Sequence, residues 1–280
     1  MKRIETIREL QEVELYISKE LVRVCKENNV QIYLSAGTLL GAVREKGFIP
    51  WDDDVDFCMS RPEFEKLMQA TGGKIGEKCR IIDTTTDQTY PGLIPLCVYE
   101  NSYVRSMQFK KDENLKISCS IFIYDGAPAT KIGRFFYYKH MYLLRAKHAL
   151  CRADFKHVNT KIARKVGPFL SHFFKEKSVW KYKAKIMKFQ QKYPYSESRF
   201  VSTNADSDAK NEVFLKETFE KPVEVEFEGM MFPTFSHYRE YLESVYGDYM
   251  TPPPETARNP KHGFIAEIED EFYEKIETKA

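Results

Sequence analysis

The first part of the chain alternates between two spacings of apolar residues. Five apolar side chains near the N-terminus recur at helical spacing: Leu10, Val13, Ile17, Leu21 and Val24. Asn28 and Asn29 follow them as a stop signal, so the spacing predicts one amphipathic helix that ends there. Residues 31–35 (QIYLS) alternate polar and apolar side chains, which predicts a strand, and residues 39–45 (LLGAVRE) predict a short helix.

The later parts of the chain show the same mixture of periods. Residues 81–82 and 93–99 predict further strands. Between Lys131 and Lys192, aromatic residues recur among lysines. This stretch predicts two or three amphipathic helices, separated near Asn159 and at Gly167-Pro168. We therefore expect a mixed fold with a helical segment in the middle of the chain.

Charge is distributed unevenly along the chain. The whole chain has a net charge of +2, but residues 131–192 hold 17 Lys and Arg against two acids, a balance of +15, so the remainder carries −13. Such basic, aromatic-rich helices suit an anionic membrane surface or a negatively charged acceptor. They suit equally a helical subdomain with an aromatic core and a lysine face in solvent. Nucleic acid is not expected as a partner, because no recognised binding motif accompanies the charge.

Length and cysteine usage indicate a cytoplasmic protein with a substantial core. A chain of 280 residues can form one large domain, or one domain with a helical elaboration. No apolar run approaches the ~20 residues of a membrane span, and residues 1–15 lack the apolar centre of a signal peptide. The six cysteines, without any Cys-x-x-Cys pair, predict buried free thiols rather than disulfides or zinc. They are Cys25, Cys58, Cys79, Cys97, Cys119 and Cys151.

The densest chemistry lies in residues 37–56, GTLLGAVREKGFIPWDDDVD, which hold Asp52, Asp53, Asp54 and Asp56. If these residues lie on a strand, Asp52, Asp54 and Asp56 share one face. Neighbouring carboxylates on that face are then roughly 7 Å apart and repel one another. A hard cation such as Mg²⁺ neutralises such repulsion. The cluster predicts a metal-dependent active site, and the alternative is an acidic surface loop.

A second feature of this segment suits the binding of phosphate. Thr38 of the Gly37-Thr38 turn can cap the short helix, whose first N–H groups favour an anion. Arg44, about two turns along, is expected to reach the same anion with its planar guanidinium. A Gly-Ser/Thr turn followed by Asp-x-Asp is typical of the nucleotidyltransferase fold. We therefore predict an α/β fold, a nucleotidyltransferase-like mixed sheet with flanking helices and a basic helical insertion.

Residues 33–59, YLSAGTLLGAVREKGFIPWDDDVDFCM, resemble the defining motif of the LicD family. That family includes bacterial phosphocholine transferases, and its more distant relatives fukutin and fukutin-related protein use CDP-ribitol. Residues 120–128 (SIFIYDGAP) are similar to the family's Asp-Ile-Phe-Pro-Leu-Asp strand. Residues 227–229 and 241–258 resemble its C-terminal segment, as do the positions of Arg258 and His262. The resemblance spans almost the whole chain and is weakest over residues 130–200.

The chain departs from the family pattern at one position of the expected metal site. Ser120 stands where the family has Asp, which in nucleotidyltransferase folds supplies a third metal carboxylate from a neighbouring strand. On a regular strand Asp125 points to the opposite face from Ser120 and cannot replace that carboxylate. We expect Asp125 to be structural, bonding a turn at Gly126, and the metal site to rest on Asp54 and Asp56.

The resemblance implies an enzyme that transfers a phospho-alcohol group. The donor it favours is CDP-choline, which gives up phosphocholine and releases CMP. The acceptor is a hydroxyl of a cell-surface glycan, a lipid-linked glycan or a teichoic acid or lipopolysaccharide precursor. CDP-ribitol and CDP-glycerol are the alternative donors. The alternative from another class, suggested by Ser120, is a catalytically impaired member that binds glycan or nucleotide.

The resemblance also assigns roles to residues and segments. The implied catalytic residues are Asp52, Asp54 and Asp56, with Asp54 and Asp56 holding Mg²⁺ (or Mn²⁺) and Asp52 as flanking ligand or general base. The implied substrate-binding residues are Gly37, Thr38, Arg44 and Arg258. Residues 1–130 form the catalytic core, residues 131–200 the basic insertion, and residues 201–280 a C-terminal segment that completes the core. Peripheral contact with the inner face of the cell membrane is a further expectation.

Overall fold

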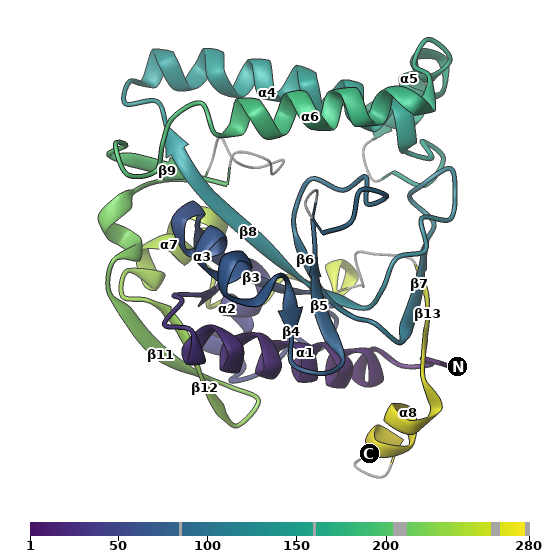
Figure 1. Cartoon of the computed structure of the whole chain (residues 1–280), viewed down its shortest axis with the longest axis vertical. Coiled ribbons are helices and arrows are strands. Elements are labelled where there is room, and N and C mark those ends of the chain that lie inside the picture. The colour runs from purple at the N-terminus through teal and green to yellow at the C-terminus, as the bar shows by residue number, and fades with distance from the viewer. Residues whose placement is uncertain (84–85, 159–160, 204–211, 259–263, 278–280) are drawn as a thin grey trace.

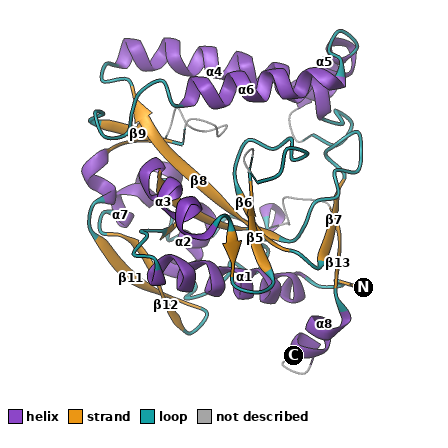
Figure 2. Ribbon diagram, in the orientation of Figure 1, coloured by secondary structure: helices purple, strands orange, loops and turns teal. Residues whose placement is uncertain are grey.

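A branched mixed β-sheet organises the computed structural model, which describes residues 1–83, 86–158, 161–203, 212–258 and 264–277 (Figures 1 and 2). The path of the sheet is β10-β9-β8-β6-β5-β4, and β3 branches from β8 and pairs with β2. Its strands are β2 (Tyr33–Leu34), β3 (Val55–Ser60), β4 (Lys74–Ile75), β5 (Cys79–Ile82), β6 (Leu96–Tyr99), β8 (Ser118–Ala127), β9 (Phe200–Ser202) and β10 (Val213–Leu215). Only the β3–β8 pair is parallel among the described ladders of this sheet. The predicted mixed α/β fold is confirmed.

Smaller β-elements and eight described helices surround this sheet. β1 (Lys2–Arg3), β13 (Phe264–Ile268) and β7 (Ser102–Ser106) form one small sheet, and β11 (Pro222–Phe227) and β12 (Met230–Phe235) form a hairpin. The helices are α1 (Ile7–Glu27), α2 (Ala36–Arg44), α3 (Arg61–Thr71), α4 (Lys131–Arg152), α5 (Lys161–Ser171), α6 (Val179–Gln190), α7 (Tyr238–Tyr246) and α8 (Asp270–Glu277). The described part of the chain also contains three short 3₁₀ turns: η1 (Glu176–Ser178), η2 (Lys216–Phe219) and η3 (Glu255–Ala257).

Helix α1 forms where the apolar spacing predicted it. It begins with a capping box, in which Thr6 accepts a hydrogen bond from the Glu9 N–H and the Glu9 carboxylate accepts one from the Thr6 N–H. It ends at Asn28, and Asn29 then takes a φ of 53°, which stops the helix. The apolar face of α1 lies in the main core, against the sheet.

The basic stretch forms a helical layer, defined here as α4, α5 and α6, at one end of the molecule (Figure 1). α4 and α6 run side by side, with the Tyr137 and Phe189 rings stacked 4.7 Å apart. The predicted helix break at Gly167-Pro168 is wrong, because α5 continues through both residues. A Cβ on Gly167 would lie 2.1 Å from the Phe155 ring, so this glycine allows close packing inside a helix. The predicted break at Asn159 lies outside the described residues.

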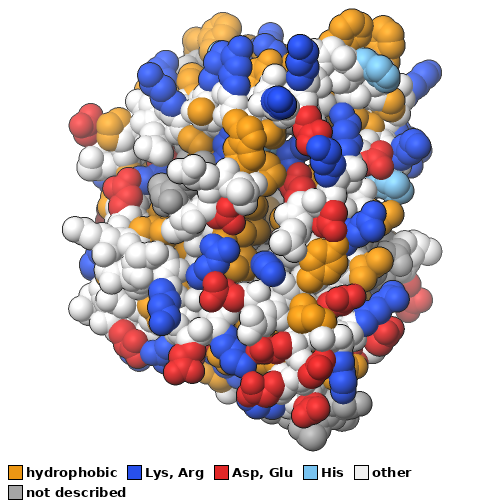
Figure 3. All heavy atoms as spheres, turned by 45° about the vertical axis from the view of Figure 1, so that its right-hand side comes forward, with side chains coloured by type: hydrophobic (Ala, Val, Ile, Leu, Met, Phe, Trp, Pro, Cys, Tyr) orange, Lys and Arg blue, Asp and Glu red, His pale blue; other side chains and the backbone are white. Residues whose placement is uncertain are grey.

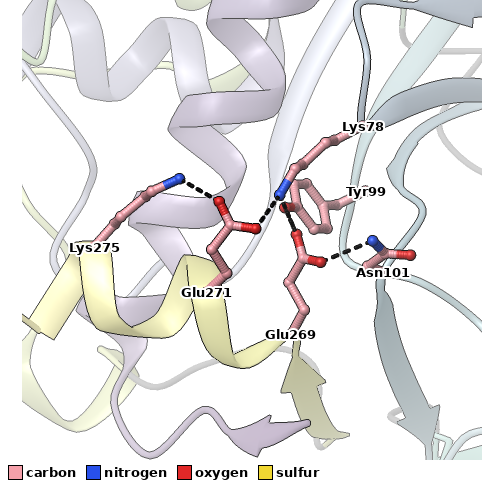
Figure 4. Close-up of polar contacts among 6 residues, drawn as sticks. All are labelled: Lys78, Tyr99, Asn101, Glu269, Glu271 and Lys275. Atoms are coloured by element: carbon pink, nitrogen blue, oxygen red, sulfur yellow. Dashed lines mark hydrogen bonds and ion pairs between the residues drawn. The ribbon is translucent and has the colours of Figure 1, made fainter.

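Polar contacts attach the C-terminal segment to the core (Figure 4). Glu269 accepts hydrogen bonds from Lys78 at 2.6 Å, from Asn101 at 2.8 Å and from the Tyr99 hydroxyl. Burial alone raises the pKa of Glu269, but the hydrogen bonds from these three donors together outweigh it, so the net effect is a lowered pKa. The carboxylate therefore stays ionised and joins residues nearly 200 positions apart in sequence.

The cysteines lie in the core, as predicted. All six are free and buried. Burial raises the pKa of Cys25 to about 12 and that of Cys79 to about 12, so both thiols stay protonated. None of the described helices is long and apolar enough to cross a membrane.

Candidate active site

The aspartate cluster lies in a loop that leads into β3. The strand begins at Val55, so the expected alternation of Asp52, Asp53 and Asp54 between two strand faces is wrong. All three residues nonetheless offer a carboxylate oxygen within 4.8 Å of one another. Asp56 lies inside β3 and is 8% exposed. The geometry thus adds Asp53 to the candidate ligands, whereas the pairing of Asp54 with Asp56 on one metal stays a prediction.

Helices α1 and α2 hold this loop in place. The Gln11 amide donates hydrogen bonds to the carbonyl oxygen of Asp52 at 2.9 Å and to that of Ile49 at 3.3 Å. Asp52 reaches the first turn of α2 closely, because a Cβ on Gly37 would lie only 2.8 Å from Asp52 Oδ2. Glycine at position 37 therefore leaves room for this carboxylate beside the helix.

Thr38 has a different role from the expected helix cap. Helix α2 already begins at Ala36, with Ser35 as its N-cap residue, so Thr38 lies within the first turn. The Thr38 hydroxyl instead accepts a hydrogen bond from the Asp56 N–H at 2.9 Å and so fixes β3 to α2. Ala36 has a φ of 47°, which is strained for a residue with a Cβ, and its N–H donates to the Tyr241 hydroxyl at 3.3 Å.

A fifth carboxylate, Glu14 of α1, faces the aspartate cluster and was missed from the sequence. It is 3% exposed, and its Oε2 accepts no hydrogen bond from the described residues. Burial raises its pKa well above the usual range, and the charges of Asp54, Asp53, Asp52 and Asp56 raise it further. The signal was available, because Glu14 lies four residues after Leu10 and three before Ile17, on the buried face of α1.

This arrangement fits a divalent cation. Several carboxylates in a partly dry site repel one another, and an acceptor atom of Glu14 has no donor among the described residues. Oxygen-only, negatively charged ligand sets are those that Mg²⁺ and Mn²⁺ prefer. A bound cation would remove the repulsion and satisfy the acceptor in the same step.

Aromatic side chains of the C-terminal segment line the same region. Burial raises the pKa of Tyr246, and the charges of Asp56 and Glu212 raise it further, although 40% of the residue stays exposed. Its neutral phenol therefore lies close to the carboxylates. Trp51 precedes the aspartate loop, and the Arg258 guanidinium lies over its ring at 5.3 Å.

The two predicted binding arginines already have protein partners. Arg44 donates to Glu45 at 2.7 Å and to the Tyr249 carbonyl at 3.2 Å, and its side chain is 7% exposed. Arg258 donates to the Pro253 carbonyl at 2.8 Å. Their binding of donor phosphates stays a prediction. His262 lies outside the described residues.

The register between β3 and β8 shows which residue lies next to Ser120. In the parallel pair with β3, Ser120 lies opposite Asp56, so a carboxylate at position 120 would sit beside the cluster. Asp125 is structural, as expected, because both its oxygens accept hydrogen bonds from Arg61, at 2.9 and 2.7 Å. The expected turn at Gly126 is wrong, since β8 extends to Ala127.

Comparisons with known proteins relate this chain to one family. A sequence model described as "LicD/FKTN/FKRP, nucleotidyltransferase domain" matches residues 29–161, which include the aspartate loop and β8. The lipopolysaccharide cholinephosphotransferase LicD of Haemophilus influenzae is 30% identical over 274 residues, covering 94% of this chain and 97% of that protein.

Two shorter matches come from uncharacterised rickettsial proteins. RT0683 of Rickettsia typhi is 43% identical over 72 residues, or 22% of this chain and 23% of that protein. RP689 of Rickettsia prowazekii is 36% identical over 61 residues, or 18% and 23%. The near full-length match to the Haemophilus enzyme carries the assignment, and it confirms the predicted enzyme class, a LicD-type transferase. The chain belongs to the LicD family.

Proposed function

We propose that this protein transfers phosphocholine from CDP-choline to a hydroxyl of a cell-surface glycan precursor and releases CMP. The observation that carries the proposal is the carboxylate cluster against the first turn of α2, in a chain that matches a cholinephosphotransferase almost end to end. A cation site beside a helix N-terminus is suited to a diphosphate, because both elements favour negative charge.

The carboxylates of Asp52, Asp53 and Asp54 would hold Mg²⁺, with Mn²⁺ as the alternative, and Asp56 and Glu14 lie around them. When bound, the metal would neutralise the negative charge that develops on the transferred phosphoryl group. The side chains contribute most by positioning, since phosphoryl transfer depends mainly on orientation and electrostatic stabilisation.

The other residues either bind the donor or activate the acceptor hydroxyl. The N–H groups of Gly37 and Thr38 bind donor phosphate at the start of α2, and Arg44 and Arg258 add positive charge. Asp52, when it does not bind the metal, takes the proton of the attacking hydroxyl as general base. Choline carries a permanent positive charge, and the ring of Tyr246 beside the carboxylates suits such a group.

A second candidate is a family member that binds nucleotide or glycan without turnover. Ser120 favours it, because the register places this uncharged residue beside Asp56 where the family has a carboxylate. Glu14 argues against it, because that side chain adds a carboxylate from α1 to the same cluster.

The deciding experiment measures CMP release from CDP-choline, CDP-ribitol and CDP-glycerol. Lipopolysaccharide and teichoic acid serve as acceptors, with Mg²⁺ or with EDTA, and Asp54→Asn is the matched inactive protein. We expect CDP-choline to be used fastest and EDTA to abolish release. If CDP-ribitol or CDP-glycerol is used faster, that compound replaces CDP-choline as the proposed donor. Full activity in EDTA would refute the proposed metal requirement. Calorimetric binding of CDP-choline without release would establish the second candidate.

A further inference from the structure

The helical layer presents an apolar face to solvent. Of the 18 large apolar side chains that are exposed among the described residues, 11 belong to this layer and the turn after α5. On α5, Ile162, Val166, Phe169, Leu170 and Phe173 follow at intervals of four, three, one and three residues, which places them on one side of the helix. Phe173 lies just past the end of α5, and its ring contacts that of Phe169 at 5.6 Å.

The side of α5 that packs against the molecule is a different one. Gly167 is buried there against the Phe155 ring. Phe169 is 67% exposed and Phe173 is 72% exposed, so neither ring is covered by the described residues. Large apolar surfaces of this kind mark interaction sites in monomeric proteins.

Helix α4 carries a second exposed apolar row beside the first. Its members are Ile132, Phe135, Phe136, Tyr142 and Leu143, spaced for one side of a helix. Figure 3 shows apolar side chains gathered at the end of the molecule that the helical layer forms, with Lys and Arg between them. The two rows therefore belong to one end of the protein.

The charge around these rows has a single sign. α4, α5 and α6 contain no acidic residue, and nine of their lysines and arginines are exposed. None of these nine side chains forms an ion pair with the residues that the structure describes. The remainder of the chain carries the opposite net charge, −13 against +15 for residues 131–192.

We infer that the helical layer docks on an anionic lipid bilayer, with α4 and α5 lying in the plane of the membrane surface. Aromatic and aliphatic side chains enter the boundary between headgroups and acyl chains, while the lysines remain among anionic headgroups. The acidic remainder is repelled by the same surface, which orients the protein with its helical layer toward the lipid.

Two other occupants of this face are disfavoured by the same observations. A second copy of the chain would bring two surfaces of strong positive charge together, with no acidic residue on either to pair with them. A hydrated anionic polymer would satisfy the lysines but would leave Phe169, Phe173 and Ile162 in water.

Flotation with lipid vesicles tests the inference without any need for catalysis. The full chain is mixed with phosphatidylcholine vesicles or with vesicles rich in phosphatidylglycerol, at low and at physiological salt. We expect flotation with the anionic vesicles, weaker at physiological salt because the Debye length falls to about 8 Å. Phe169→Ser with Phe173→Ser should reduce the bound fraction roughly tenfold, since two aromatic rings lose their burial.

Matched variants separate the apolar from the charged contribution. Lys161→Glu with Lys165→Glu should cost roughly thirtyfold, because each basic residue near the surface contributes about 1 kcal/mol. Met230→Ser with Met231→Ser and Lys74→Glu with Lys221→Glu change exposed residues outside the layer and should float as the parent does.

Three outcomes would overturn the inference. The first is flotation that is absent or unaffected by the helical-layer variants, which leaves a solvated face. The second is a dimer by light scattering that Phe169→Ser with Phe173→Ser dissociates, without vesicle binding. The third is soluble teichoic acid binding as tightly as vesicles and unaffected by the loss of both Phe rings. Melting temperatures of all variants confirm that each is folded.

Discussion

The carboxylate site and the helical layer depart from the usual distribution of residues in opposite directions. At the site, charged side chains are buried: Glu14, Asp52 and Asp53 are each no more than 5% exposed. In the helical layer, apolar side chains are exposed, and Phe169 and Phe173 stand mostly in solvent. Buried charge and exposed apolar surface are the two informative exceptions to ordinary burial.

The comparison shows that each exception points to a ligand of complementary chemistry. Like charges at the site repel one another until a cation lies between them. The basic apolar layer has the reverse need, an anionic and apolar surface. Sequences depart from locally consistent patterns mainly at functional positions, which is why both departures support the proposals made above.

The proposed metal site depends most strongly on Asp54, which both the sequence and the geometry place in the carboxylate cluster. Asp54→Asn should lower turnover at least a hundredfold, because losing a charged ligand removes several kcal/mol of transition-state stabilisation. The protein should remain folded, since one source of repulsion on Glu14 disappears. Steady-state rates and melting curves measure both effects.

Two companion variants decide which aspartates act together. Asp56→Asn should match the loss in Asp54→Asn if the predicted pair holds the metal, whereas Asp53→Asn should match it if the group within 4.8 Å does. Glu240→Gln, an exposed acid of α7, is the control. Near-normal turnover in Asp54→Asn would show that the cluster is not the catalytic site.

The helical layer also buries one charge, Lys183 of α6, and its sign is opposite to that of Glu14. Lys183 is 1% exposed, its ammonium donates to the Tyr90 carbonyl, and it lies 4.7 Å from the Tyr90 ring centre. Its pKa is lowered from 10.5 to about 8, mainly by burial, which outweighs the raising effect of the nearby Asp83 charge; the charge of Arg152 adds a smaller lowering effect.

The sign of the pH dependence follows from that lowered pKa. Between pH 8 and 10.5 the unfolded chain keeps the Lys183 proton and the folded protein has released it, so the free energy of unfolding rises with pH. Lys183→Met should remove about 2–3 kcal/mol of this rise. Denaturant unfolding across the window measures it, with exposed Lys185→Met as the control. Parallel curves for Lys183→Met and the parent would refute the assignment.

The sequence was most informative where spacing and local chemistry agree. The apolar spacing of α1 and its stop at Asn28 were enough to place that helix, and the motif was enough to identify the acidic loop. The loop's conformation was not predictable from alternation, because Asp52 is held by Gln11 and Gly37, which lie elsewhere in the chain. Contacts of this kind are tertiary, and no local pattern contains them.

Helix α5 and Asp125 also depend on tertiary contacts that the local sequence does not reveal. Gly167-Pro168 is locally a helix breaker, yet packing against Phe155 keeps both residues in one helix. For Asp125 the structural role was predicted, but its partner Arg61, which belongs to α3, was not. Strand alternation gives the face of a side chain, whereas the partner depends on which elements meet there.

The missed carboxylate gives the next prediction. Glu14→Gln should weaken the binding of Mg²⁺ or Mn²⁺ to the nucleotide-free protein about tenfold, because residues around a metal site typically contribute that much to affinity. Ser120→Asp should have the opposite effect, since position 120 lies opposite Asp56. Calorimetry measures both, and Ser118→Asp, two residues earlier on β8, is the positional control. Equal isotherms for all variants would remove Glu14 and position 120 from the site.

Arg44 tests how far the site extends along α2, with the smallest expected effect. Its guanidinium already donates to Glu45 and to the Tyr249 carbonyl, so Lys can replace its charge but not both hydrogen bonds. If the remaining face of the guanidinium binds donor phosphate, Arg44→Lys should raise the KM for CDP-choline about fivefold, roughly 1 kcal/mol. A structural role predicts instead a lower melting temperature with an unchanged KM. Because the two outcomes move different quantities, kinetics and melting on the same variant decide whether Arg44 serves the donor or the fold.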